Sequence, residues 1–415
     1  MGILILGRLL QGLGGGGLDV LGEIIVTDIT TLKERPLYLG LFALPMAGGG
    51  IFGPMIGAIF SQYASWRWIG WVNLPLIAVA LPLSFFFLRL RPINTTFGER
   101  LRMLDWIGIF LFATGSTLVA LPMSWAGSMY PWSSWKTLVP LIIGAITLVG
   151  FVFYETKPVE PVFPRRIFGN ITANATLLGS FIHGAILYSV VLYAPLFFQA
   201  VYLESPFKAS VSILPVSSTI VGFSVIAAVG VEFVRKYRVG IIASWIMIAT
   251  GCGLWALWQR SSSLALKSGL QVVAGLGIGN LFSLLVIPMQ ACVSNVDDAG
   301  LAVGILVSFR LFGGLIGLAI CATIFNNIFE HRISDLGDLV GADVREAISF
   351  IPALKASHLE SSVLESIIDA YRESMMSIFL FLSGLGVVGF ISSLFTKELT
   401  IESEDLGRQH LEAPS

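Results

Sequence analysis

Charged residues are scarce in this chain of 415 residues, at 12% of the sequence against about 25% in an ordinary soluble domain. The 25 lysines and arginines nearly balance the 26 acids, so the basic face that binding to nucleic-acid phosphates requires is not indicated. Hydrophobic residues make up 55%, and there are 44 glycines. The composition excludes an ordinary soluble domain and predicts a protein that crosses a lipid bilayer many times.

Cysteines and catalytic motifs are also rare. The three cysteines, Cys252, Cys292 and Cys321, lie within or beside apolar segments without ligand spacing, so they are interpreted as small core residues, with no disulfide framework and no metal site. The sequence contains no H-E-x-x-H, no G-x-S-x-G and no phosphate loop ending in Gly-Lys-Ser or Gly-Lys-Thr. The run Gly14 to Gly17 follows no strand. We therefore predict no enzyme, no cofactor and no nucleotide.

Long apolar runs are abundant. About eleven are near the ~20 residues that a helix needs to cross the hydrocarbon core, which predicts an all-α polytopic fold. They are 3–27, 38–60, 68–88, 106–123, 138–153, 173–198, 211–231, 239–257, 268–289, 300–325 and 377–395. The longest connection, 326–376, has helical apolar spacing at Val363, Ile367 and Ala370, which predicts short amphipathic helices at the surface. A solvated cap is favoured there over a surface for a partner.

Basic residues are concentrated in alternate loops, which predicts that those loops are cytoplasmic. They include Lys33, Arg89, Arg165 and Arg235, whereas the other loops are poor in lysine and arginine. This places the C-terminus inside, and an odd number of spans places the N-terminus outside. Loop 326–376 would then be extracellular and 397–415 would be a cytoplasmic tail.

A glycine-rich stretch from 48 to 58 interrupts the second apolar run. Gly49, Gly53 and Gly57 recur every fourth residue, so on a helix they share a face that a neighbouring backbone could approach closely. Pro54 removes a backbone hydrogen bond on that helix and predicts a bend. A tight, bent interface indicates a pivot or a seal.

The pattern G-x-x-x-G-P-x-x-G formed by these residues resembles the antiporter motif of major facilitator drug exporters. Further motifs resemble the same family in the same order, and jointly they resemble its fungal branch of fourteen-helix drug:proton antiporters. They are Arg8-x-x-Gln11-Gly12, Glu23 to Asp28, Trp66-Arg67-Trp68, Leu104 to Gly108, Glu160 to Pro164, Pro195 to Val201 and Phe309 to Gly314.

The resemblance implies helices bundled into two halves, with the first three helices of the family pattern lacking. Residues 1–90 would be the remnant of the N-terminal bundle with three spans, and 91–170 would hold two linker spans. Residues 171–396 would form the C-terminal six-helix bundle. The family's function would be efflux of small amphipathic organic compounds in exchange for protons, in a membrane that we expect to be the plasma membrane.

Ionisable residues inside membrane spans are costly and indicate function. Arg8, Asp19 and Glu23 share the first span, and eleven residues, or about three turns, separate Arg8 from Asp19, so they are predicted to lie along one stripe. Such a carboxylate could exchange a proton while the arginine tunes it. The resemblance supports Arg8 and Glu23 but not Asp19. The alternative is that Arg8 reaches the interface and Glu23 only bonds to a neighbouring helix.

Arg310 lies about ten residues into the tenth apolar run, and Gly313 and Gly317 follow it at small-xxx-small spacing. It is predicted either to relay charge or latch helices, or to extend to the cytoplasmic headgroups.

The segment with His183, Tyr188, Tyr193 and Gln199 offers apolar walls with sparse polar groups, as a pocket for amphipathic molecules does, and Gln11 joins these substrate-binding candidates. A lone histidine is more commonly a satisfied interior residue.

Two other functions remain open at this stage. One is uptake, for example of siderophores, by the same fold. The other is a shortened membrane protein that transports nothing, because a first span with two acids and four consecutive glycines inserts poorly.

Overall fold

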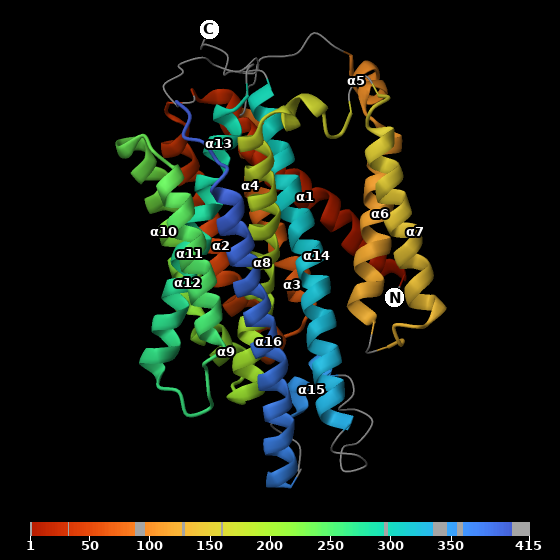
Figure 1. Cartoon of the computed structure of the whole chain (residues 1–415), viewed down its shortest axis with the longest axis vertical. Helices are drawn as coiled ribbons and strands as arrows, with labels where there is room; N and C mark the ends of the chain where they lie inside the picture. The colour runs from red at the N-terminus through yellow and green to blue at the C-terminus, as the bar shows by residue number, and fades with distance from the viewer. Residues whose placement is uncertain are drawn as a thin grey trace.

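The computed structural model describes residues 2–31, 33–87, 96–126, 129–158, 161–293, 298–334, 347–354 and 360–400, and these are almost entirely helical (Figure 1). The helices are α1 (Gly2–Ile29), α2 (Arg35–Tyr63), α3 (Trp68–Trp71), α4 (Asn73–Phe87), α5 (Phe97–Met103), α6 (Trp106–Trp125), α7 (Trp135–Tyr154), η1 (Arg165–Gly169), α8 (Ile171–Val201), α9 (Pro206–Ser212), α10 (Leu214–Val234), α11 (Arg238–Trp255), α12 (Leu264–Leu284), α13 (Val286–Ala291), α14 (Ala299–Ser334), α15 (Ala347–Leu354) and α16 (Ser361–Ser393).

Ten stretches of the described helices are long and apolar enough to cross a membrane, and they coincide with ten of the eleven predicted runs. They include two pairs that count as single spans, α3 with α4 and α12 with α13. Helix α2 covers the remaining run, 38–60. The prediction of an all-α polytopic fold is confirmed.

The segment 326–376 differs from its prediction. Helix α14 continues to Ser334 and α16 already begins at Ser361, so the two spans extend beyond the predicted limits as straight continuations, and residues 335–346 and 355–359 lie outside the described part. Val363, Ile367 and Ala370 do form a buried face, as their spacing predicts, but it joins the main core. Separate surface helices are therefore wrong for 361–376, because this apolar face finds aromatic partners on α14, among them Phe329.

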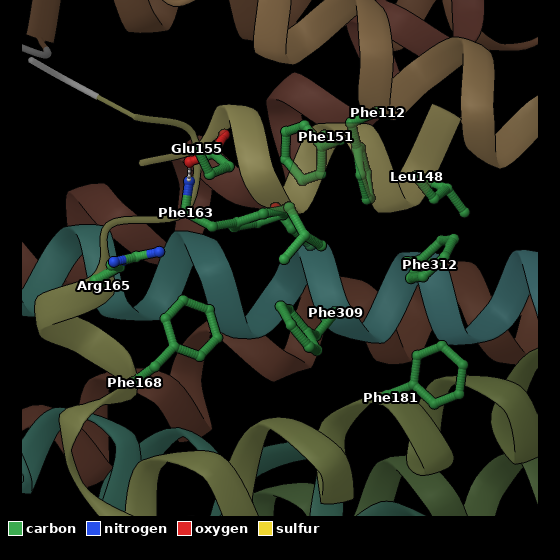
Figure 2. Close-up of a pocket in the computed structure, with 12 residues that line it drawn as sticks. Phe112, Leu148, Phe151, Glu155, Phe163, Arg165, Phe168, Phe181, Phe309 and Phe312 are labelled. Atoms are coloured by element: carbon green, nitrogen blue, oxygen red, sulfur yellow. Dashed lines mark hydrogen bonds between the residues drawn. The ribbon is translucent and has the colours of Figure 1, made fainter. Parts of the chain in front are cut away.

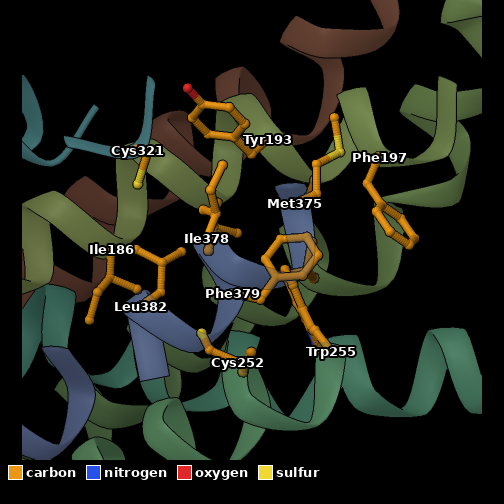
Figure 3. Close-up of a cluster of buried hydrophobic side chains, with 14 of the residues drawn as sticks. Ile186, Tyr193, Phe197, Cys252, Trp255, Cys321, Met375, Ile378, Phe379 and Leu382 are labelled. Carbon is orange, nitrogen blue, oxygen red and sulfur yellow. The ribbon is translucent and has the colours of Figure 1, made fainter. Parts of the chain in front are cut away.

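The main core lies among α8, α10, α11, α12, α14 and α16. Figure 3 shows its centre, where Phe197, Trp255 and Phe379 meet beside Cys252. The rings of Trp255 and Trp258 stack with centroids 4.8 Å apart. Cys252 and Cys321 are buried here as predicted, whereas Cys292 is half-buried.

The helices before residue 90 have fewer contacts with the helices that form the main core. The first half of α1 is exposed, and α4 has no buried residue. The second half of α1 lies against α14, and α2 lies against α10. Helices α6 and α7 form a hairpin at one side (Figure 1), where Gly115 and Gly144 let the two backbones approach closely.

The two ends of the bundle differ in their connections. Helices α5 and α13 lie at one end, and α9 and α15 lie at the other (Figure 1). The positive-inside pattern assigns the first end to the cytoplasm, which stays a prediction, as does the division of the chain into bundles and linker. Within the predicted tail 397–415, residues 401–415 lie outside the described residues.

Candidate functional site

A buried ion pair joins α1 to α14. Arg310 Nη1 lies 3.3 Å from Glu23 Oε1, and both side chains are 2% exposed. Arg310 Nη2 also donates to the Phe282 carbonyl of α12 at 3.1 Å, and the guanidinium carbon lies 4.3 Å from the centre of the Phe282 ring. Arg310 therefore has a buried partner and does not extend to the headgroups.

This ion pair leaves hydrogen-bonding capacity unused. Within the described part of the chain, Glu23 Oε2 and Arg310 Nε are buried without a hydrogen-bond partner. Asp19, one turn earlier on α1, is close enough to repel the charge of Glu23. One turn later, Thr27 accepts a hydrogen bond from Gln290 of α13 at 3.1 Å. The second half of α1 therefore places a polar strip against α13 and α14.

Glycines bring the helices of the site together. A Cβ on Gly304 would lie 3.3 Å from Ile24, so α14 offers α1 a shallow surface somewhat less than two turns before Arg310. A Cβ on Gly313 would overlap the Phe181 carbonyl, and one on Gly317 would lie 2.6 Å from Ala185. The small-xxx-small contact predicted for Gly313 and Gly317 is confirmed, and its partner is α8.

His183 lies near this pair, on α8. It is fully buried, its Nε2 donates to the Ile278 carbonyl at 2.9 Å, and its ring lies edge-on to Phe282 with centroids 6.2 Å apart. Its Nδ1 has no partner among the described residues. His183 and Arg310 thus share Phe282 as a neighbour, and a role for His183 in protons or substrate stays a prediction.

The other substrate candidates are dispersed. The ring of Tyr188 packs on Gly314, close to the ion pair. Tyr193 lies in the main core beside Phe325. Gln199 is sixteen residues beyond His183 on the same helix, about 24 Å along its axis. These residues therefore do not line one pocket.

Arg8 and Gln11 lie on the exposed half of α1, where Arg8 donates to Gln11 at 3.1 Å. Fifteen residues of helix, about 22 Å, separate Arg8 from Glu23. The predicted stripe is continuous in angle, but its arginine is too distant to act on the carboxylates. Arg310 of α14 takes that place.

The glycine motif of α2 does not form the expected close contact. A Cβ on Gly49, Gly53 or Gly57 would meet no described atom within 4 Å, and only the neighbouring Gly50 approaches α10, at 3.9 Å from Val221. The tight interface is wrong for this conformation because α2 turns a different face to α10. A conformational role for these glycines and Pro54 stays a prediction.

An aromatic cavity of about 500 Å³ lies between the α6–α7 hairpin and helices α8 and α14 (Figure 2). Its lining is Phe112, Leu148, Phe151, Val152, Glu155, Phe163, Arg165, Phe168, Phe181, Ser308, Phe309 and Phe312. Sequence reasoning missed this cavity because its phenylalanines come from five separate segments, and no spacing connects them. Glu155 could have drawn attention as an acid directly after a membrane span.

Comparison with known proteins places these features in a family. Residues 1–318 match the family model of the Major Facilitator Superfamily. The chain is 45% identical to the MFS-type transporter sphD of Aspergillus fumigatus, over 99% of this chain and 72% of that protein. It is 34% identical to the efflux pump FUS6 of Gibberella fujikuroi, over 96% and 73%, and 33% identical to the MFS-type efflux pump LUC4 of a Fusarium species, over 97% and 72%.

The fold has a solved counterpart. A bacterial homologue of the human lysosomal transporter Spinster, crystallised in an inward-facing and unoccupied conformation, superimposes with a TM-score of 0.50 at 16% identity, over 90% of this chain and 74% of that chain. Family model, relatives and fold agree with the motifs found in the sequence. The chain belongs to the major facilitator superfamily and is homologous to fungal efflux pumps.

Proposed function

We propose that this protein takes part in export of small amphipathic organic compounds in exchange for protons, with Glu23 as the residue that carries the proton. The observation that supports this proposal most is the buried pair of Glu23 and Arg310, which connects α1 with α14. Major facilitator transporters work by rocking one helix bundle against the other. A charge pair across such a contact can be opened by neutralising one partner.

The contacts of the pair suit such a switch. When Glu23 binds a proton, its attraction to Arg310 is lost, while Arg310 keeps the Phe282 carbonyl and ring as partners. The buried guanidinium is thus not left alone, which would be very costly in a low dielectric. The α1–α14 contact then rests on the apolar packing of Val20 and Ile24 over Gly304. Protonation would therefore loosen this contact without unfolding either helix.

The test is the variant Glu23→Gln, which keeps the shape and hydrogen bonding of the side chain but cannot change its charge. We expect accumulation of the exported compound in fungal cells and loss of pH-gradient-driven transport in membrane vesicles, at normal expression. Efflux of a panel of fluorescent amphipathic compounds, with the gradient imposed and then collapsed by an ionophore, measures this.

Glu365→Gln is the matched control, because Glu365 forms an exposed ion pair with Arg260 at the other end of the molecule. It should transport like the unmodified protein. Gradient-driven transport that persists in Glu23→Gln would remove Glu23 from the coupling step. Accumulation driven inward by the gradient would instead favour uptake by the same fold.

A further inference from the structure

The aromatic cavity has one polar end and one apolar end. Figure 2 shows Glu155 and Arg165 at the same end, while Leu148, Phe181 and Phe312 surround the other. Glu155 directly follows the last residue of α7, and Arg165 begins η1 ahead of α8, so both lie where membrane spans end. The apolar end lies about two helical turns deeper along α7. The cavity is therefore polar at headgroup depth and apolar at acyl-chain depth.

The carboxylate of Glu155 has an unused acceptor at this polar end. Glu155 is 8% exposed, and its Oε2 accepts a hydrogen bond from the Phe163 amide at 3.0 Å. Its Oε1 is buried without a hydrogen-bond partner among the described residues. Burial raises the pKa of the Glu155 carboxyl, the amide bond of Phe163 lowers it, and the nearby Asp105 raises it further. A cationic donor placed at Oε1 would offset the cost of holding this charge in apolar surroundings.

Arg165 supplies the complementary charge. Its side chain is exposed and makes no ion pair with a described residue, whereas the adjacent Arg166 is paired with Asp298 at 3.0 Å. The cavity mouth thus offers a carboxylate for a cation and a guanidinium for an anion, at the same end of the cavity. A ligand that fits both carries a positive and a negative group close together.

The cavity also borders the membrane-facing surface of the hairpin. Val152 lines the cavity and is 65% exposed. On the same helix Ile142, Ile146 and Val149 are exposed, although they are apolar. A volume of about 500 Å³ has room for one acyl chain but not for a whole phospholipid, and the second chain can lie along this surface. A bilayer lipid is therefore favoured over a compound that must be enclosed completely.

We propose that the aromatic cavity is a binding site for an amine-bearing phospholipid, with the lipid ammonium at Glu155 Oε1, its phosphate at Arg165 and one acyl chain among the phenylalanines. The site lies on the side of α14 that carries Phe309 and Phe312, and Arg310 points away from it toward Glu23. The lipid would hold the α6–α7 hairpin to the bundle. This inference does not depend on the direction or the energy source of transport.

Headgroup selectivity tests the proposal directly. Phosphatidylethanolamine, phosphatidylcholine and phosphatidylglycerol with identical acyl chains are titrated into the delipidated protein in detergent, and bound lipid is counted by native mass spectrometry. We expect phosphatidylethanolamine to bind about tenfold more tightly than the other two, the effect of one charge-assisted hydrogen bond. Choline has no N–H donor for Oε1, and the glycerol headgroup has no cation.

Substitutions assign the two charges. Glu155→Gln keeps an acceptor for the Phe163 amide, so the fold should persist, but it should abolish the preference for phosphatidylethanolamine. Arg165→Gln should weaken all three lipids by a similar factor. Glu99→Gln and Arg102→Gln on α5, at the same end of the molecule but outside the cavity lining, are the matched controls and should bind all lipids unchanged.

Blocking the mouth gives a second measurement. Val152→Trp places a bulky ring at the entrance, where the exposed position tolerates it, and should weaken every lipid at least tenfold. Val149→Trp, three residues earlier and exposed outside the cavity lining, should have no such effect. The proposal is overturned if Glu155→Gln retains the preference, if the three lipids bind equally to the unmodified protein, or if Val152→Trp binds them normally.

Discussion

The two charges of the buried pair come from distant parts of the chain. Glu23 and Arg310 were each recognisable in the sequence, because an ionisable residue inside an apolar run is costly enough to need a partner. Their pairing was not recognisable, since 287 residues separate them and Arg8 offered a nearer partner on the same helix. Sequence spacing fixes which face a residue occupies, but only the packing of α1 on α14 decides what lies opposite.

Removing Arg310 alone should be worse than removing both charges of this pair. Arg310→Gln leaves Glu23 buried without its cation, and we expect a loss of about 3–5 kcal/mol in the free energy of unfolding. The double variant with Glu23→Gln should recover most of that loss, because two neutral amides can bond to each other. Thermal unfolding of the purified protein in detergent measures the cycle. Additive losses in the double variant would show that the two side chains act independently.

Helix α14 presents three surfaces with different tasks. One carries Arg310 toward Glu23, one carries Phe309 and Phe312 toward the aromatic cavity, and one carries Gly313 and Gly317 against α8. The glycine spacing was read correctly on this helix but wrongly on α2. Glycines spaced four apart show that one face of a helix lacks side chains. They do not show in which conformation a neighbouring helix packs against that face.

The contact of α14 with α8 predicts a sharp difference between two glycines. In Gly313→Ala the new methyl would meet the Phe181 carbonyl, and a backbone group cannot rotate away, so we expect a loss of about 2–3 kcal/mol. Gly222 on α10 has no described atom within 4 Å of a Cβ, and Gly222→Ala should be neutral or stabilise by up to about 1 kcal/mol. The shift in melting temperature of each variant measures this. Equal shifts would contradict the close α8–α14 contact.

Burial is distributed unevenly over the whole molecule. Helices α8, α10, α11, α12, α14 and α16 share one core, whereas α3 and α4 contain no buried residue. Composition predicted helices in both regions equally well, because apolar residues facing lipid and apolar residues facing protein look alike in a sequence. Which helices have buried side chains is therefore evident only in the structure.

This unevenness predicts which spans open first. Helix α11 inserts the fully buried Trp245 and Trp255 into the core, so its backbone amides should exchange only on opening of the whole body. Helices α3 and α4 lack such contacts and should exchange at least about tenfold faster in detergent, after correction for intrinsic rates. Hydrogen–deuterium exchange with mass spectrometry compares peptides from 68–87 with peptides from 238–255. Helix α7 is the internal reference for a lipid-facing span, because it packs closely against α6 around Gly144. If 68–87 is as protected as 238–255, the first helices are held by contacts that burial of their side chains does not reveal.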